Sequence, residues 1–350
     1  MPVTEASATE ASPLVTAILL TYDSEPYVAA ALASVLAQDY RPMEVLISDD
    51  ASTDGTYDVL QRELAGYAGP HRVRLRRREA NSGSKSAHLN DVFPLCSGEV
   101  LVSFDADDVS GGHRVSRIVA AFRSDPRIQA VFSRYSLMDA SGRPLGDATV
   151  PHPPSAEGTS AWFARVDANA SGTTLAVRRD VVERFPPLIP EIAEDLVLPF
   201  RASLLGEVAF LDESLVTARR HPDSLTTDLE RYDSIDRYRS RQELGIERAA
   251  RNLESRLADL RVAESRSPER AHEWRRLEAV AVESLARARA TADIVHPALG
   301  VRLLTLLRLI RSRWYLEHLP RHALLAIAPR WYLRYKRRAL GAQGGAEPGS

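Results

Sequence analysis

The chain contains 350 residues, and its 45 Lys and Arg against 47 Asp and Glu give a formal net charge of -2 at pH 7. This length allows one large α/β domain with an appendage, or two domains, and the near-neutral charge argues against a general nucleic-acid-binding protein. The single cysteine, Cys96, excludes an intramolecular disulfide bond and fits a reducing compartment.

The first half of the chain alternates between strand-like and helix-like segments. Val15–Leu20 is a short apolar run, Tyr27–Gln38 has apolar residues at helical spacing, and Met43–Ser48 is apolar again. These segments predict a strand, a helix and a second strand, which together make one βαβ unit.

The alternation continues after a turn at Asp54-Gly55. The next segments are expected as helix, strand, helix and strand, in the order Thr56–Leu64, Arg72–Leu75, Ser84–Leu95 and Val100–Phe104. Such alternation is typical of a mostly parallel, doubly wound sheet.

Three carboxylates follow the last of these strands, at Asp105, Asp107 and Asp108. Open α/β sheets bind ligands at the carboxyl ends of their strands, and carboxylates two residues apart can share a hard divalent cation that keeps phosphate oxygens among its ligands. The cluster therefore predicts a metal-bridged phosphate substrate, and a solvated acidic turn is the alternative. The sequence contains neither G-x-G-x-x-G after the first strand nor a Walker lysine motif, which argues against dinucleotide-type and P-loop phosphate sites.

The composition changes after Asp228. Ser240–Ala290 is rich in Ala, Arg, Glu and Leu and predicts one or more long helices. Val301–Leu340 alternates apolar clusters with arginines around one acidic residue, Glu317, and no apolar run reaches the about 18 residues that a membrane-spanning helix needs. This basic amphipathic pattern favours attachment to an anionic membrane surface, and a helix–helix contact in a homodimer is the alternative.

Several motifs follow one another along the chain, at Val15–Asp23, Ala33–Tyr40, Glu44–Thr56, Asn81–Gly83, the D-x-D at Asp105 and Asp107, Ser171-Gly172, Glu194-Asp195 and Arg219–His221. Together they resemble the motifs of family 2 glycosyltransferases of the GT-A fold. The resemblance covers residues 14–227. It departs from the family pattern at Leu20, where proline is usual, and at Asp23, where asparagine is common.

The resemblance implies a Rossmann-like GT-A domain, with a mixed, mostly parallel sheet and helices on both faces, followed by a helical extension. The expected organisation is a disordered leader at 1–12, a catalytic domain at 13–227, a helical region at 228–340 and a disordered tail at 341–350. The leader has no basic segment and no apolar core, so it is not expected to be a signal peptide.

The resemblance also implies a site for a nucleotide diphosphate sugar. The residues expected to bind this donor are Thr21, Tyr22, Asp23 and Asp50 around the base and ribose, Lys85 and Arg220 at the diphosphate, and Asp105 and Asp107 of the D-x-D. An aromatic ring with carboxylates suits a flat base with polar edges, and a compact cation such as Lys85 suits phosphate. The alternatives are a half-buried core aromatic at Tyr22 and an ordinary surface lysine at Lys85.

A divalent cation, Mn or Mg, is the expected cofactor. By resemblance its ligands are Asp105, Asp107 and His221, with Asp107 as the typical metal ligand and Asp105 as the carboxylate that contacts the sugar or ribose. A structural histidine is the alternative for His221, and Asp108 either assists the site or caps the following segment.

The pair Glu194-Asp195 resembles the motif whose aspartate is the general base. An acceptor hydroxyl must lose its proton as it attacks the anomeric carbon, so one carboxylate within hydrogen-bond reach suffices for a single displacement with inversion. We assign this role to Asp195 from the family match, with Glu194 beside it in the catalytic pair. The alternative is a pair of charges that stabilises a helix N-terminus, which does not exclude catalysis.

Acceptor recognition is expected between the two acidic motifs, within Arg134–Pro190. Trp162 and Phe163 in this stretch could stack against a sugar ring or belong to the core. Ala176–Arg179 resembles the family's acceptor-side strand.

The sequence thus predicts an inverting, metal-dependent glycosyltransferase that moves a sugar to a hydroxyl of a glycan or lipid-linked acceptor during cell-surface polysaccharide synthesis. A UDP-sugar is the expected donor because uridine donors are commonest in the family. The alternatives are a catalytically silent nucleotide-sugar-binding scaffold of the same fold and a D-x-D phosphatase of the haloacid dehalogenase type. The expected location is the cytoplasm, with peripheral attachment to the inner face of the cell membrane.

Overall fold

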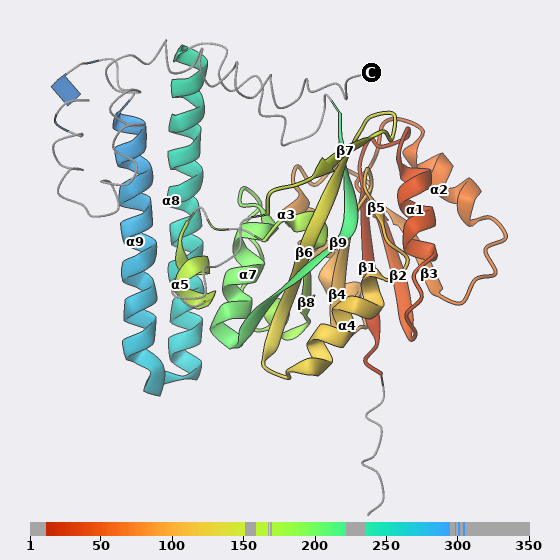
Figure 1. The fold of residues 1–350 in the computed structure, drawn as a ribbon, viewed down its shortest axis with the longest axis horizontal. Coiled ribbons are helices and arrows are strands. Elements are labelled where there is room, and N and C mark those ends of the chain that lie inside the picture. Colours follow the sequence, from red (N-terminus) through yellow and green to blue (C-terminus); the bar gives the residue numbers. More distant parts are fainter. Residues whose placement is uncertain are drawn as a thin grey trace, which may run out of the picture. The chain divides into compact units, whose positions relative to one another are not determined.

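The computed structural model describes residues 12–150, 159–166, 168, 170–221, 235–294, 298, 300, 301 and 304, with the backbone alone at 235–242, 291 and 292. The chain divides into two compact units (Figure 1). The first takes the chain up to residue 160 and residues 169–219, and the second takes residues 161–168 and the chain from residue 220 onward. The predicted leader, tail and basic C-terminal segment lie, apart from single residues, outside the described part.

Nine strands of the described residues form one sheet in the order β3-β2-β1-β4-β8-β6-β9-β5, with β7 paired to β6. The strands are β1 (Val15–Thr21), β2 (Met43–Asp49), β3 (Arg72–Arg77), β4 (Val100–Asp105), β5 (Val109–Ser110), β6 (Ile128–Asp139), β7 (Pro144–Asp147), β8 (Ala176–Arg178) and β9 (Glu207–Arg220). The neighbours among β1 to β4 are parallel, whereas β8 joins β4 and β6 in antiparallel pairs. The α/β fold predicted from the alternating segments is confirmed, and so is the mixed sheet that the family resemblance implies.

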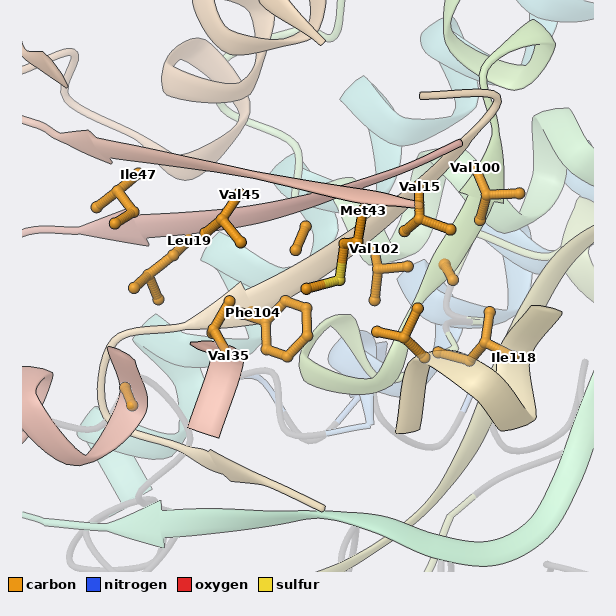
Figure 2. Packing of buried hydrophobic residues seen from close by; sticks show 14 of the residues in the cluster. Val15, Leu19, Val35, Met43, Val45, Ile47, Val100, Val102, Phe104 and Ile118 are labelled. Atoms are coloured by element: carbon orange, nitrogen blue, oxygen red, sulfur yellow. The ribbon is translucent and has the colours of Figure 1, made fainter. Parts of the chain in front are cut away.

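The central strands are buried on both faces. Every residue of β1 and β2 is buried, which is typical of parallel strands that helices cover on two sides. Successive side chains point to opposite faces, and Leu19 lies in one core cluster with Val45 and Phe104 (Figure 2). Its neighbour Ile18 is buried outside that cluster. Two apolar layers therefore enclose the sheet.

The helices of the first unit follow the expected periodicity. They are α1 (Val28–Leu36), α2 (Thr56–Leu64), α3 (Lys85–Val92), α4 (Arg114–Ser124), α6 (Asp180–Glu183) and α7 (Glu194–Leu205), while α5 (Thr159–Ala164) spans the division between the units. In α1 the buried residues Val28, Ala31, Leu32 and Val35 recur at helical spacing. Helices α1 and α2 lie on one side of the sheet, and α3 and α7 lie on the other (Figure 1).

The strand register brings the polar ends of three strands together. Thr21 at the end of β1 pairs with Asp49 at the end of β2, and Leu20 pairs with Asp105 at the end of β4. The loops that follow these strands therefore begin at one edge of the sheet, where open α/β sheets bind ligands.

The second unit contains a helical hairpin, formed by α8 (Ile235–Arg266) and α9 (Ala271–Asp293). It encloses the segment 161–168, in which Phe163 is fully buried. The amide of Asn252 on α8 donates to the carbonyl of Val166 at 2.6 Å, and the hydroxyl of Ser284 on α9 accepts from the Val166 N–H at 3.0 Å. Of the two roles considered for Phe163, the structure therefore supports the core. No helix among the described residues is long and apolar enough to cross a membrane.

Candidate active site

Lys85 joins the two acidic motifs of the sequence. Its Nζ lies 2.6 Å from Oδ1 of Asp105, at the end of β4, and 2.8 Å from Oε1 of Glu194, the first residue of α7. Asp105 and Glu194 are 89 residues apart in the sequence, by subtraction of their numbers. The structure therefore brings together three of the predicted site residues in one ion cluster.

The position and charge of Lys85 follow from its surroundings. Ser84 caps α3 by accepting the N–H of Ala87 on its hydroxyl at 3.1 Å, and this cap fixes Lys85 at the start of the helix. Burial alone would lower the pKa of Lys85, but Asp105 and Glu194 raise this pKa above its usual value. The amine is therefore a cation held between two carboxylates.

Asp195, next to Glu194, has the proton affinity of a general base that works near neutral pH. Burial and the neighbouring charge of Glu194 raise the pKa of Asp195 to about 7, while Lys85 and a hydrogen bond from the backbone of Gly172 act in the opposite direction. Both carboxylates lie in the first turn of α7. Their negative charges are stabilised there by the helix dipole, and this position at a helix N-terminus does not exclude a catalytic role for the pair.

Gly172 packs directly against the acidic pair. A Cβ atom at this position would lie 2.6 Å from Oε1 of Glu194 and 3.5 Å from Cβ of Asp195. The preceding residue, Ser171, has a φ of 40°, an unusual value for a residue with a side chain. The backbone of this loop can approach the two carboxylates closely only because residue 172 is glycine.

Asp50 is held by the loop that precedes α3. Its carboxylate accepts the N–H of Ser82 at 2.9 Å and the hydroxyl of Ser82 at 2.6 Å, and the Nε of Arg78 lies 3.0 Å away. Asp50 is buried. The loop after β2 is thereby fixed to the loop that leads to Lys85.

The predicted nucleoside-binding residues at the end of β1 differ in exposure. Thr21 is buried, and its hydroxyl donates to Asp49 at 3.0 Å. Tyr22 is 47% exposed, which leaves its ring open to a planar ligand. Asp23 accepts the N–H of Thr53 at 2.7 Å. Thr21 and Asp23 therefore support the loop, and Tyr22 is the accessible member of the three.

Arg114 is a buried cation that the sequence pattern did not reveal. It donates to the carbonyls of Ser103 at 2.8 Å and Thr173 at 2.9 Å, and its guanidinium group lies 4.5 Å from the ring centre of Phe104. Burial lowers the pKa of Arg114 to about 10, and Asp105 is the main group that opposes this change. Arg114 thus supplies positive charge beneath the D-x-D, although its position in α4 resembles that of any helix arginine in the sequence.

Asp108 closes the D-x-D loop rather than facing outward. It accepts the hydroxyl of Thr173 at 2.5 Å and the N–H of Arg219 at 2.8 Å. Burial and the charges of Asp105 and Asp107 raise the pKa of Asp108 to about 7. Asp108 therefore connects the D-x-D loop to Thr173 and to the end of β9.

Arg219 ties the end of β9 to the same loop, because its Nε donates to the carbonyl of Asp107 at 3.0 Å. Arg220 ends β9 and His221 follows it, both partly buried and both in the second unit. The predicted roles of Arg220, of His221 and of the Asp107 carboxylate stay predictions.

A second feature missed in the sequence connects α3 with the segment before α7. Asn90 donates to the carbonyl of Leu188 and accepts the N–H of the same residue, both at 2.8 Å. Ser86 donates to the carbonyl of Ile192 at 2.5 Å. With the ion pair between Lys85 and Glu194, these bonds fix the helix that begins with Lys85 to the segment that leads into Asp195.

The donor atoms at the D-x-D suit a hard cation. Asp105 and Asp107 supply carboxylate oxygens, the ligand type that Mg²⁺ and Mn²⁺ take together with water and phosphate. Among the described residues, no three His, Cys, Asp or Glu side chains are grouped so that they could hold a metal ion. Two carboxylates fit a cation that receives its remaining ligands from a bound diphosphate and water.

Several known proteins have sequences similar to that of this chain. The glycosyl transferase family 2 model matches residues 16–185. An uncharacterized glycosyltransferase of Nostoc sp. is 30% identical over 214 residues, which cover 59% of this chain and 65% of that protein. The putative teichuronic acid biosynthesis glycosyltransferase TuaG of Bacillus subtilis is 33% identical over 38% of this chain and 51% of its own length. The chain thus spans about half to two thirds of these relatives.

Solved structures share the fold. TarS of S. aureus in complex with UDP-GlcNAc has a TM-score of 0.50 at 18% identity, over 87% of this chain and 92% of that chain. The mannosyltransferase PcManGT of Pyrobaculum calidifontis, in complex with GDP-Man and Mn²⁺, has a TM-score of 0.51 at 19% identity, over 99% of this chain and 92% of that chain. The family match over residues 16–185, the glycosyltransferase relatives and this fold together make the chain similar to the family 2 glycosyl transferases.

Proposed function

We propose that the chain is an inverting, metal-dependent glycosyltransferase that uses a nucleotide diphosphate sugar. The observation that supports this most strongly is the ion cluster of Lys85, Asp105 and Glu194, because it joins the D-x-D to the first turn of the helix that bears Asp195. A donor bound at the D-x-D would thus have its reacting carbon near a carboxylate with a pKa of about 7.

The donor in this proposal lies across the loops at the ends of β1, β2 and β4. Tyr22 offers a ring for the base, and Asp23 and Asp50 lie on the two neighbouring loops. Lys85 and Arg220 are the proposed cations at the diphosphate. TarS and PcManGT were solved with UDP-GlcNAc and GDP-Man, and we take a UDP-sugar as the donor to be tested first.

Asp105 and Asp107 are the proposed protein ligands of a Mn or Mg ion, and the role of His221 as a third ligand stays a prediction, because the described residues do not group three such side chains. Such a cation, when bound, supplies positive charge that stabilises the departing diphosphate. The chain's own cations, Lys85 and Arg220, would add to that charge. Lys85 would then exchange its contact with Asp105 for a contact with the donor.

Asp195 acts as the general base in this proposal. The acceptor hydroxyl forms a bond to the anomeric carbon while the bond from that carbon to the diphosphate oxygen breaks, and the hydroxyl proton passes to the Asp195 carboxylate. One displacement inverts the anomeric configuration. The backbone of Gly172 holds the Asp195 carboxylate by a hydrogen bond, and the charge of Glu194 raises its pKa.

The acceptor in this proposal is a glycan or a lipid-linked sugar in surface polysaccharide synthesis. The relative TuaG has a name that refers to teichuronic acid biosynthesis, and another relative is the chondroitin synthase of Escherichia coli. We also propose a cytoplasmic enzyme whose basic segment at residues 301–340 attaches to the inner membrane surface. Vesicle flotation tests this attachment, and equal binding of the wild type and a full-length variant with Ala at Arg334, Lys336, Arg337 and Arg338 would contradict it.

Calorimetric titration with uridine, thymidine and guanosine diphosphate sugars, with and without Mn or Mg, tests the donor proposal. We expect metal-dependent binding of one donor, weakened by about tenfold or more in Asp107→Ala because a metal ligand is lost. Asp58→Ala, a matched change at an exposed residue of α2, should bind like the wild type. A wild-type protein that binds none of these donors would contradict the proposal. Donor binding without turnover on any acceptor would instead favour the scaffold alternative.

A further inference from the structure

Helix α7 contains a proline, Pro199, in its interior. In an α-helix the N–H of each residue donates to the carbonyl four residues earlier, so residue 199 would pair with the carbonyl of Asp195. Proline has no N–H, and its ring pushes this carbonyl away from the helix axis. The carbonyl of Asp195 is therefore left without its usual partner inside the helix.

The loop before Gly172 uses that carbonyl. The backbone N–H of Ala170 donates to the carbonyl of Asp195, with 3.3 Å between nitrogen and oxygen. Ala170 is fully buried, and a buried N–H needs a partner. Two residues later, the backbone of Gly172 bonds the carboxylate of the same aspartate. The loop thus contacts Asp195 through both its main chain and its side chain.

We propose that Pro199 is a positioning residue for Asp195. By freeing the Asp195 carbonyl, the proline lets Ala170–Gly172 hold the aspartate in a fixed orientation toward the acceptor side of the site. This inference rests on the proposed function insofar as it concerns catalysis, since Asp195 is the general base there. The hydrogen bond itself is a property of the fold and is tested separately.

Pro199→Ala restores an N–H that competes with Ala170 for the Asp195 carbonyl. We expect faster hydrogen–deuterium exchange at the Ala170 amide, together with a kcat for transfer that falls by about tenfold or more, as a small misplacement of a reacting group does. Donor affinity should be unchanged, because the residues proposed to bind the donor are not altered. The melting temperature should be at least that of the wild type, since alanine favours the helix interior.

Pro199→Leu restores the same N–H without loss of apolar volume and is measured in parallel. Pro94→Ala is the control, because Pro94 stands at the start of a short 3-10 helix (Phe93–Leu95) rather than in a helix interior. It should change neither Ala170 exchange nor kcat.

Unchanged Ala170 exchange in both Pro199 variants would overturn the inference. Faster exchange with an unchanged kcat would show that Pro199 does not position Asp195 for catalysis. Equal losses of donor affinity and of kcat would show the same, because the effect would then not be confined to the base. If the wild type transfers no sugar from any donor, the proposed function fails, whereas the exchange rate of Ala170 still decides whether Pro199 directs this hydrogen bond.

Discussion

Burial and the nearby charges of Glu194, Asp105 and the Lys85 ammonium group together determine the pKa of Asp195. Burial and Glu194 dominate, so the pKa rises to about 7. A carboxylate accepts a proton only when it is ionised. The activity of the free enzyme should therefore increase as the pH rises through this pKa.

We expect kcat/KM to rise by about tenfold between about pH 6 and about pH 8, as the ionised fraction of Asp195 grows. A pH–rate profile with the preferred donor measures this change. In Glu194→Gln the midpoint should move to lower pH, because the negative charge that raises the Asp195 pKa is gone. A profile that is flat, or that falls over this range, would refute the assignment.

A second prediction at the level of single residues concerns Gly172. The Cβ of Gly172→Ala would lie 2.6 Å from Oε1 of Glu194, so the carboxylate must move and its contact with Lys85 lengthens. We expect kcat to fall by about tenfold or more in steady-state assays, with donor affinity retained. The matched control is Gly245→Ala in α8, where a Cβ meets nothing within 4 Å. This control should keep full activity and gain about 1 kcal/mol of stability from helix propensity.

At the scale of elements, α3 connects the D-x-D loop to α7, the helix that begins with Glu194 and Asp195. The side chain of Asn90 makes two hydrogen bonds with the main chain of Leu188, and Ser86 bonds Ile192 closer to α7. These contacts fix the segment that leads into Glu194 and Asp195.

Asn90→Ala should lower kcat by several-fold while the donor dissociation constant stays the same, because only the position of the base changes. Unfolding free energy should fall by about 1–2 kcal/mol for the two lost bonds. Calorimetry, kinetics and denaturant titration separate these effects. Arg179→Ala serves as the control, since it removes two bonds to the carbonyl of Gly98 just before β4 begins and should reduce stability alone. A loss of stability in Asn90→Ala without any change in kcat would contradict the idea that Asn90 fixes the position of Asp195.

The helical hairpin of the second unit depends on a buried arginine. Arg256 donates to the carbonyls of Phe163 at 3.1 Å and Arg165 at 2.8 Å and also contacts Asn252. Arg256→Met removes these hydrogen bonds between α8 and the segment around Phe163, and we expect a loss of about 3 kcal/mol in unfolding free energy by denaturant titration. Arg251→Met on the same helix breaks an exposed pair with Glu247, and we expect it to cost about 0.5 kcal/mol or less. Equal effects of the two changes would contradict this account.

At the scale of the whole molecule, the sequence predicted the central sheet because apolar runs and helical periodicity are local signals. The helix at Thr56–Leu64 agrees in both bounds. Strand β9 is continuous over Glu207–Arg220, although its charged residues Asp212 and Glu213 separate the apolar pattern into two parts. A partly exposed strand tolerates such residues, so the apolar pattern alone does not define it.

The parts of the site that the sequence did not predict depend on contacts between distant segments. Arg114 and Asn90 look like ordinary polar helix residues until the fold brings Thr173 and Leu188 beside them. No local signal in the sequence assigns the segment 161–168 to the second unit, because its contacts are with α8 and α9, far along the chain. The predicted domain boundary at residue 227 marks a change in composition and stays a prediction.

We propose that Asp195 accepts the proton of the acceptor hydroxyl as this hydroxyl attacks the bound donor sugar. The decisive measurement is the release of nucleoside diphosphate by Asp195→Asn, together with a donor titration. We expect a donor affinity equal to that of the wild type and a kcat lower by about 10² to 10⁴-fold, while Asp180→Asn at the start of α6 keeps full activity. Turnover of Asp195→Asn at the wild-type rate would show that Asp195 is not the base.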